Sequence, residues 1–219
     1  MGSSDALPPL PKAARKGATR AAFVAAAHAL ARRGTGADPL DPAAVTAEAG
    51  TSRPLFYAHF PSRGDFVEAL LASIHEDGPR ALDTPAGDSP AAGLLEFFDR
   101  LAAPLDRHAA LARALIPASH LPGPVAEARA ERRRRAVARV ADLLPARVPE
   151  REARAAFLMD AFLGLQLAWS KGTVPGDLRD RVRRELPWAI AGVLAAAPSP
   201  LPAPIPVPPP RPVSPPEVP

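Results

Sequence analysis

The chain has 219 residues, no cysteine and a formal net charge of +4. The lack of cysteine excludes disulfides and thiolate metal sites, so we expect a protein of the reducing cytoplasm. No apolar run is long enough to span a membrane, no signal peptide is expected, and the absence of strand-like alternation predicts an all-α fold.

The N-terminal residues 1–17 contain prolines and basic residues, and we expect them to form a flexible basic arm. The first helix is predicted from Ala18 to Arg33, because apolar residues repeat there at helical spacing and Gly34 can end the helix. The buried stripe of this helix should consist of Phe23, Ala26, Ala27 and Leu30.

The stretch from Asp41 to Phe60 predicts a helix-turn-helix. Asp41 can cap the first short helix, and Gly50 can take the positive φ that ends it. Thr51 or Ser52 then caps a second short helix. A second helix of this kind is the one that such motifs place in the major groove of DNA.

Two aromatic residues of the second short helix, Phe56 and Phe60, lie four residues apart and should face the core together. Ser62, with Asp65 three residues later, predicts the cap of a fourth helix. We therefore expect an N-terminal domain over residues 18–78, joined through this fourth helix to the rest of the chain.

Basic residues are concentrated near this motif. Residues 1–63 contain eight Lys or Arg and four Asp or Glu, a net charge of 8 − 4 = +4. This distribution suits a surface that binds phosphates.

Residues 79–197 are predicted to form a larger helical domain. One helix should begin after Ser89, and proline-containing breaks should separate those that follow. The last two helices are expected over Glu150–Lys171 and from Asp177 to about Ala197, the latter kinked or locally broken at Pro187. Residues 198–219 are rich in proline and predict a disordered or polyproline-II tail.

The run AGTSRPLFYAHFPSR, residues 49–63, resembles the DNA-binding signature of the TetR (tetracycline-repressor) family. The resemblance covers about Thr19 to Leu71. It implies a three-helix DNA-binding domain followed by a helical bundle that binds a ligand and dimerises. The C-terminal region carries no recognisable motif of its own.

By position, the resemblance implies that Tyr57 and Arg63 contact DNA phosphates. Ser52 and Arg53 should face the groove, where Arg53 either reads guanine or grips phosphate. Leu55 either meets a thymine methyl group or packs. The candidate DNA contacts are therefore Thr51, Ser52, Arg53, Pro54, Leu55, Tyr57, His59 and Arg63, together with Lys16 and Arg20 on the backbone or in a minor groove.

Two of these positions have a plainer alternative. His59 fits a structural histidine between helices better than a base reader, and Asp41 is expected to act as a cap and not as a DNA contact. A possible effector pocket is suggested only by residue type, and each candidate fits plain core or a dimer interface better than a ligand contact. The candidates are Phe98, His108, His120, Phe162, Gln166 and Trp169. The histidines show no metal-ligand spacing, so we expect neither a metal nor a cofactor.

These features favour a homodimeric repressor that binds a quasi-palindromic operator in double-stranded DNA and is released by a small-molecule effector. The last two helices of each protomer would form the dimer interface. The alternatives are a helical enzyme or small-molecule-binding protein with a helix-turn-helix-like N-terminus, and a regulator without an effector. No nucleophile–base pair or phosphate-binding glycine loop supports an enzyme. The operator, the effector, the regulated genes and the sign of regulation stay open.

Overall fold

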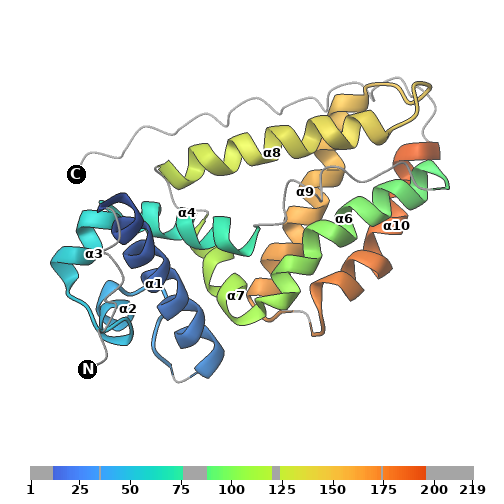
Figure 1. The fold of residues 1–219 in the computed structure, drawn as a ribbon. Helices are drawn as coiled ribbons and strands as arrows, with labels where there is room; N and C mark the ends of the chain where they lie inside the picture. Colours follow the sequence, from blue (N-terminus) through green and yellow to red (C-terminus); the bar gives the residue numbers. More distant parts are fainter. Residues whose placement is uncertain (1–11, 35, 76–87, 120–123, 174, 196–219) are drawn as a thin grey trace, which may run out of the picture.

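The computed structural model describes residues 12–34, 36–75, 88–119, 124–173 and 175–195. Within these ranges every regular element is a helix, which confirms the all-α prediction (Figure 1). No described helix is both long enough and apolar enough to cross a membrane. The predicted tail at 198–219 and most of the predicted arm lie outside the described residues.

The N-terminal domain consists of α1 (Lys12–Arg33), α2 (Pro42–Glu48), α3 (Arg53–His59) and α4 (Arg63–Ile74). Its core is a cluster of fully buried phenylalanines from three of these helices: Phe23, Phe56, Phe60 and Phe66. The ring of Phe56 lies 5.3 Å from that of Phe23 and 4.9 Å from that of Phe66, edge to face in both cases. These contacts fix α3 against α1 and α4.

Local chemistry sets the ends of these helices. Gly34 and Gly50 have φ values of 62° and 63°, a conformation that glycine tolerates without strain. The Asp41 carboxylate accepts the N–H groups of Ala43 and Ala44 and so caps α2. Ser62 caps the start of α4 through a capping box with Asp65, the residue predicted for this role.

Helix α1 is longer than predicted. It begins at Lys12, so the last part of the predicted flexible arm is helical and the expected start at Ala18 is wrong. Five of the six added residues are Lys, Ala or Arg, which are strong helix formers, and the sixth is Gly17. Because these residues add no apolar stripe, periodicity did not reveal them.

The C-terminal domain consists of α6 (Pro90–Arg107), α7 (Ala109–Ala118), α8 (Pro124–Leu143), α9 (Arg151–Ser170) and α10 (Leu178–Ala195). Helices α6, α9 and α10 pack together, and α8 lies along them and extends toward α4 (Figure 1). Ser89 caps α6 as predicted, accepting the N–H of Ala92. Helix α10 runs through Pro187 as one assigned element, so the expected local break is absent.

Carboxylates of α6 hold the start of α10. Asp106 accepts the N–H groups of Leu178 and Arg179 at 2.8 and 2.9 Å, and Asp99 pairs with Arg179 and Arg183. Burial acts to raise the pKa of Asp99, but the hydrogen bonds and charges of the two guanidinium groups outweigh it and lower that pKa.

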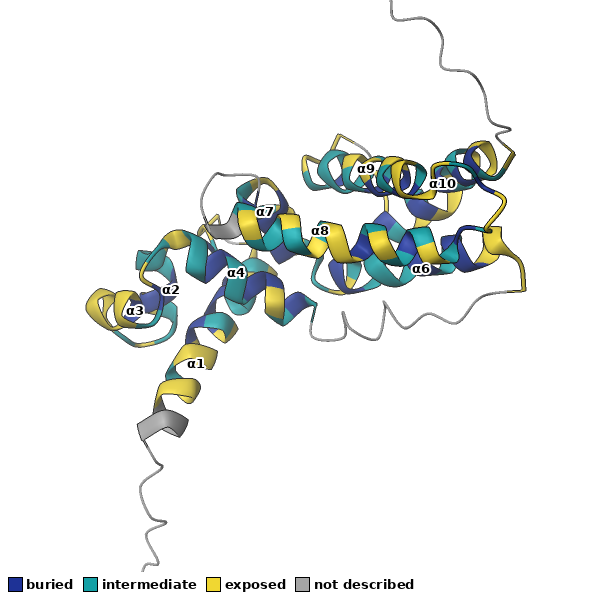
Figure 2. Ribbon diagram, turned by 90° about the horizontal axis from the view of Figure 1, so that it is seen from above, coloured by how far each residue is buried: buried dark blue, intermediate teal, exposed yellow. Residues whose placement is uncertain are grey.

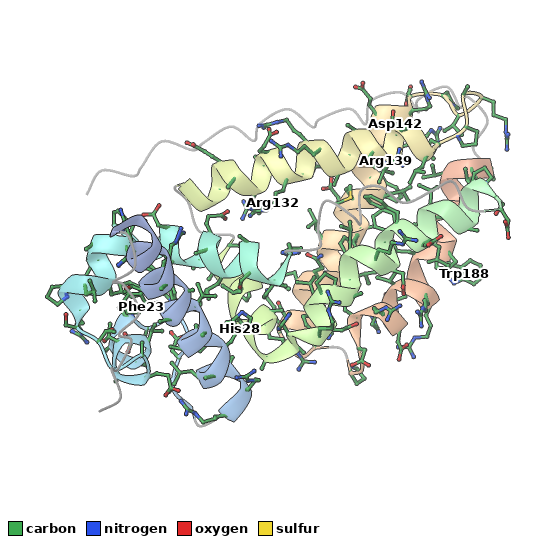
Figure 3. All side chains as sticks on the ribbon, in the orientation of Figure 1. Phe23, His28, Arg132, Arg139, Asp142 and Trp188 are labelled. Atoms are coloured by element: carbon green, nitrogen blue, oxygen red, sulfur yellow. The ribbon has the colours of Figure 1, made fainter. Side chains whose placement is uncertain are left out.

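Helix α4 connects the two domains. Its Glu68 receives two hydrogen bonds from Arg132 of α8, at 2.6 and 3.0 Å. Its Ser73 is hydrogen-bonded to His28 of α1 at 3.0 Å, and the His28 ring meets that of His108, at the start of α7, at 5.0 Å. Figure 3 shows Phe23 near α3 and His28 further along α1, close to α7.

Candidate functional site

Helix α3 has two different faces. Phe56 is fully buried beneath it, whereas Arg53, Pro54, Leu55 and Tyr57 are exposed. Figure 2 shows α3 at one end of the molecule with most of its surface open to solvent. The inner face of this short helix packs on aromatic rings and its outer face is exposed. Such a helix is suited to insertion into a groove of DNA.

The first turn of α3 leaves polar groups free. Ser52 takes the N-cap position with extended φ and ψ, but its side chain makes no capping hydrogen bond. Pro54, at the second position of the helix, has no N–H to offer that hydroxyl. The predicted side-chain cap is therefore wrong for Ser52, and the hydroxyl of Thr51 is buried without a partner among the described residues. The backbone N–H groups of Arg53 and Leu55 have no partner within the helix.

Two exposed side chains share one side of α3. Arg53 and Tyr57 are four residues apart, which places them on the same face. Tyr57 is 50% exposed, and its ring stands edge-on to Phe56 at 5.4 Å, so packing limits where the hydroxyl can point. Leu55 is 40% exposed and is therefore not a core residue, in line with the groove-facing alternative for this position.

Arg63 stands at the first position of α4. Its guanidinium lies 3.6 Å from the Asp38 carboxylate, and both side chains are more than half exposed. Pairs of this kind contribute about 0–1 kcal/mol, so Arg63 can exchange its partner for a phosphate at little cost.

Of three further predicted contacts, Arg20 and His59 have structural contacts and Lys16 is simply exposed. Arg20 lies over the Phe60 ring at 4.9 Å, which engages its charge with the aromatic core. Lys16 is exposed one turn earlier on α1. His59 is half-buried, stands edge-on to Phe23 at 6.0 Å and has a buried Nδ1 without a partner among the described residues, so its structural interpretation is favoured.

The residues suggested for an effector pocket do not gather around one described cavity. Phe98 and Phe162 are buried and meet each other at 5.3 Å, while Trp169 is buried with Arg113 stacked on its ring. His108 faces α1. Gln166 is half-buried, and His120 lies outside the described residues.

An open groove of about 710 Å³ lies between α1, α4 and α7, and of the described pocket candidates only His108 lines it. Small and basic residues share its walls. They are Gly17, Arg20, Ala21, Val24, Ala25, His28, Arg32, Ala69, Ala72, Ser73 and His108. The described residues contain no cluster of three or more side chains able to hold a metal ion.

A second exposed feature lies on the last two helices. Trp188 of α10 is 82% exposed and Phe157 of α9 is 57% exposed, and Trp188 points away from the bundle (Figure 3). Sequence reasoning did not single out Trp188. A signal was present, because Trp188 lies two residues from Leu186 and Ile190 and therefore off the buried stripe of α10.

Comparison with known proteins identifies the architecture. A TetR-family transcriptional regulator from Streptomyces coelicolor matches 81% of this chain and 80% of its own, with a TM-score of 0.60 and 23% identity. A TetR transcriptional regulator from Rhodococcus sp. RHA1 matches 83% of this chain and 97% of its own, with a TM-score of 0.60 and 21% identity. The chain has the fold of TetR-family transcriptional regulators. Thermus thermophilus FadR, a TetR-family repressor solved in complex with lauroyl-CoA, matches 83% of this chain and 98% of its own, with a TM-score of 0.56 and 24% identity.

These matches include both domains, and the TetR-type architecture inferred from residues 49–63 is confirmed at the level of the fold. No protein-family model matches the sequence, and no curated protein matches it either.

Proposed function

We propose that the chain is a TetR-family transcriptional regulator that binds operator DNA through α3. The observation that carries the proposal is the exposed face of α3, where Arg53, Tyr57 and two unpaired backbone N–H groups lie directly above a rigid phenylalanine core. Donors of this kind are what phosphate oxygens and base edges accept. Helix α3 lies at the outer end of the molecule (Figure 2), which supports this proposal.

Each candidate residue has a role in this complex. Tyr57, on the exposed face of α3, and Arg63, at the start of α4, contact backbone phosphates. The free hydroxyl of Ser52 and the guanidinium of Arg53 enter the major groove, and Leu55 presents an apolar surface to a thymine methyl group. The remaining candidates, Thr51, Pro54 and His59 around α3 and Lys16 and Arg20 on α1, lie at the border of the interface.

The active form we propose is a homodimer formed by α9 and α10. An indole ring that is 82% exposed is costly in water and is typical of the centre of an interface. Two-fold symmetry would then present two α3 helices to successive major grooves, about 10 base pairs apart, so the operator should be quasi-palindromic.

We further propose repression that is relieved by a small molecule. A ligand that shifts the C-terminal domain would move α4 through its packing against α7 and α8, which the Glu68–Arg132 pair supports, and so change the spacing of the two α3 helices. One regulator with the same fold was solved with lauroyl-CoA. We assign no catalytic activity, cofactor or metal to the chain and place its action in the cytoplasm. A helical enzyme and a regulator without effector are the alternatives that the experiments below separate.

The test is selection of bound sequences from a random DNA pool, followed by fluorescence anisotropy on the selected site at several salt concentrations. Arg63→Ala should weaken binding to all sequences and reduce the salt slope by about one unit, because one phosphate contact is lost. Arg53→Ala should also relax preference at one base pair. The matched control is Arg147→Gln, an exposed arginine between α8 and α9, which should leave binding unchanged. Failure of the wild-type chain to enrich any sequence, even at low salt, would reject the proposal.

A further inference from the structure

We propose that the groove between α1, α4 and α7 binds a small amphipathic anion, a molecule with one anionic head and one alkyl chain. At about 710 Å³ the groove falls within the ~300–1,000 Å³ of typical small-molecule sites. It lies where α1 and α4 meet α7, and His108 is the one described residue that it shares with the pocket suggested by the sequence.

One end of the groove is cationic. Arg32 is exposed on α1, one turn after His28, so both face the same side. The hydroxyl of Ser73 donates to the Leu70 carbonyl at 2.8 Å, so it accepts the Nε2–H of His28 at 3.0 Å and holds that ring in place. The His108 ring stands almost perpendicular to it, at an interplanar angle of 72°.

No acidic residue lines the groove, and no described acid pairs with Arg32. An anionic head group would therefore gain a guanidinium and nearby imidazole rings without displacing an existing partner of Arg32. A cationic head group would meet only repulsion at this end. The charge of the site thus selects the sign of the ligand.

The rest of the groove is apolar and open to solvent. Val24 and Ala25 of α1 face Ala69 and Ala72 of α4, and their short side chains leave room between the helices. The lining of α1 extends from Gly17 to Arg32, about 22 Å at 1.5 Å per residue. At the far end Arg20 is already stacked on Phe60, so the space between suits an alkyl chain.

A ligand in this groove would contact α1 of the N-terminal domain together with α4 and α7. It would therefore favour one relative position of the two domains over others. The effect of this ligand on operator affinity rests on the proposed function, whereas binding of the ligand to the groove does not.

The test is isothermal titration calorimetry of the full chain, without DNA, using sodium decanoate below its micelle concentration. We expect saturable binding of one decanoate per protomer and at least tenfold weaker binding of decyltrimethylammonium. Arg32→Gln should weaken decanoate binding roughly tenfold, because a charge-assisted contact is lost. Ala25→Phe should abolish binding by filling the apolar part. Arg147→Gln, with the same loss of charge outside the groove, should change nothing.

The site is rejected if decanoate does not bind, if both detergents bind equally, or if Arg32→Gln and Ala25→Phe both bind as the wild type does. Arg32-dependent pelleting with phosphatidylglycerol vesicles would instead identify a membrane headgroup and overturn the assignment to a free amphiphile. Because no DNA is present, a failure here is separate from a failure of operator binding.

Discussion

Removing the carboxylate of Asp106 should destabilise the C-terminal domain at the start of α10. This side chain belongs to α6 but accepts the first two N–H groups of α10, those of Leu178 and Arg179, at 2.8 and 2.9 Å. The N–H groups of a first helical turn have no partner within their own helix. Asp106→Ala would leave both groups without an acceptor in a partly buried site.

The expected size follows from the two hydrogen bonds. Loss of a capping side chain costs about 1 kcal/mol, and two bonds to one charged group should together contribute about 2 kcal/mol to the free energy of unfolding. For a chain of this length such a loss lowers the melting temperature by roughly 4–8 °C. Asp106→Asn keeps one acceptor oxygen and should lose about half as much.

The assay is urea and thermal unfolding at pH 7, with all variants at one protein concentration because dimerisation would shift apparent stability. Asp142→Ala is the matched control: this carboxylate is exposed on α8, and its loss should change the free energy of unfolding by less than about 0.5 kcal/mol. A loss for Asp106→Ala no larger than that of the control would refute the capping role, as would equal losses for the Ala and Asn variants.

Three further outcomes are expected. Trp188→Ser should shift the solution mass from dimer to monomer in analytical ultracentrifugation with helicity unchanged, and a stable dimer would contradict the α9–α10 interface. Arg179 and Arg183 lower the pKa of Asp99 in the folded protein. The ionised carboxylate therefore stabilises the fold fully at pH values above its ordinary pKa of 3.8, and this stabilisation is lost as the pH falls through the lowered pKa. The stability gap between wild type and Asp99→Asn should therefore close at acid pH, and a constant gap would contradict this. Phe56→Ala should lower the free energy of unfolding, measured by calorimetry, by roughly 3–5 kcal/mol and abolish the DNA binding measured by anisotropy. Phe56→Leu should reduce both stability and DNA binding much less.

The helix-turn-helix was predictable because its signals are local. A capping carboxylate at Asp41, a positive-φ glycine at Gly50 and a capping box at Ser62 each act within four residues of sequence. Phe56 and Phe60 also identified the inner face, since helical spacing alone puts them together. The TetR-type architecture then followed from matching residues at fixed offsets.

Features that depend on contacts between distant segments were not predictable. Asp106 and Leu178 meet across 72 positions of sequence, and the groove at His28 and His108 exists only where two domains meet. Residue type suggested Phe98 as pocket lining, yet apolar type alone does not separate a cavity wall from packed core. The absent Ser52 cap is a local exception, because Pro54 removes one of the backbone N–H groups that the Ser52 hydroxyl could accept.

The position of α4 explains how a C-terminal event can reach α3. Phe66 on its inner face contacts Phe56 at 4.9 Å, while Glu68, two residues later, is held by Arg132 of α8. Close-packed aromatic rings transmit displacement with little deformation, so α3 and α4 should move as one rigid body. A shift of α8 would then tilt the whole N-terminal domain and leave the geometry of α3 intact. Ligand control of this kind would change the spacing of the two α3 helices in the dimer. The affinity of each N-terminal domain for a single half-site would stay the same.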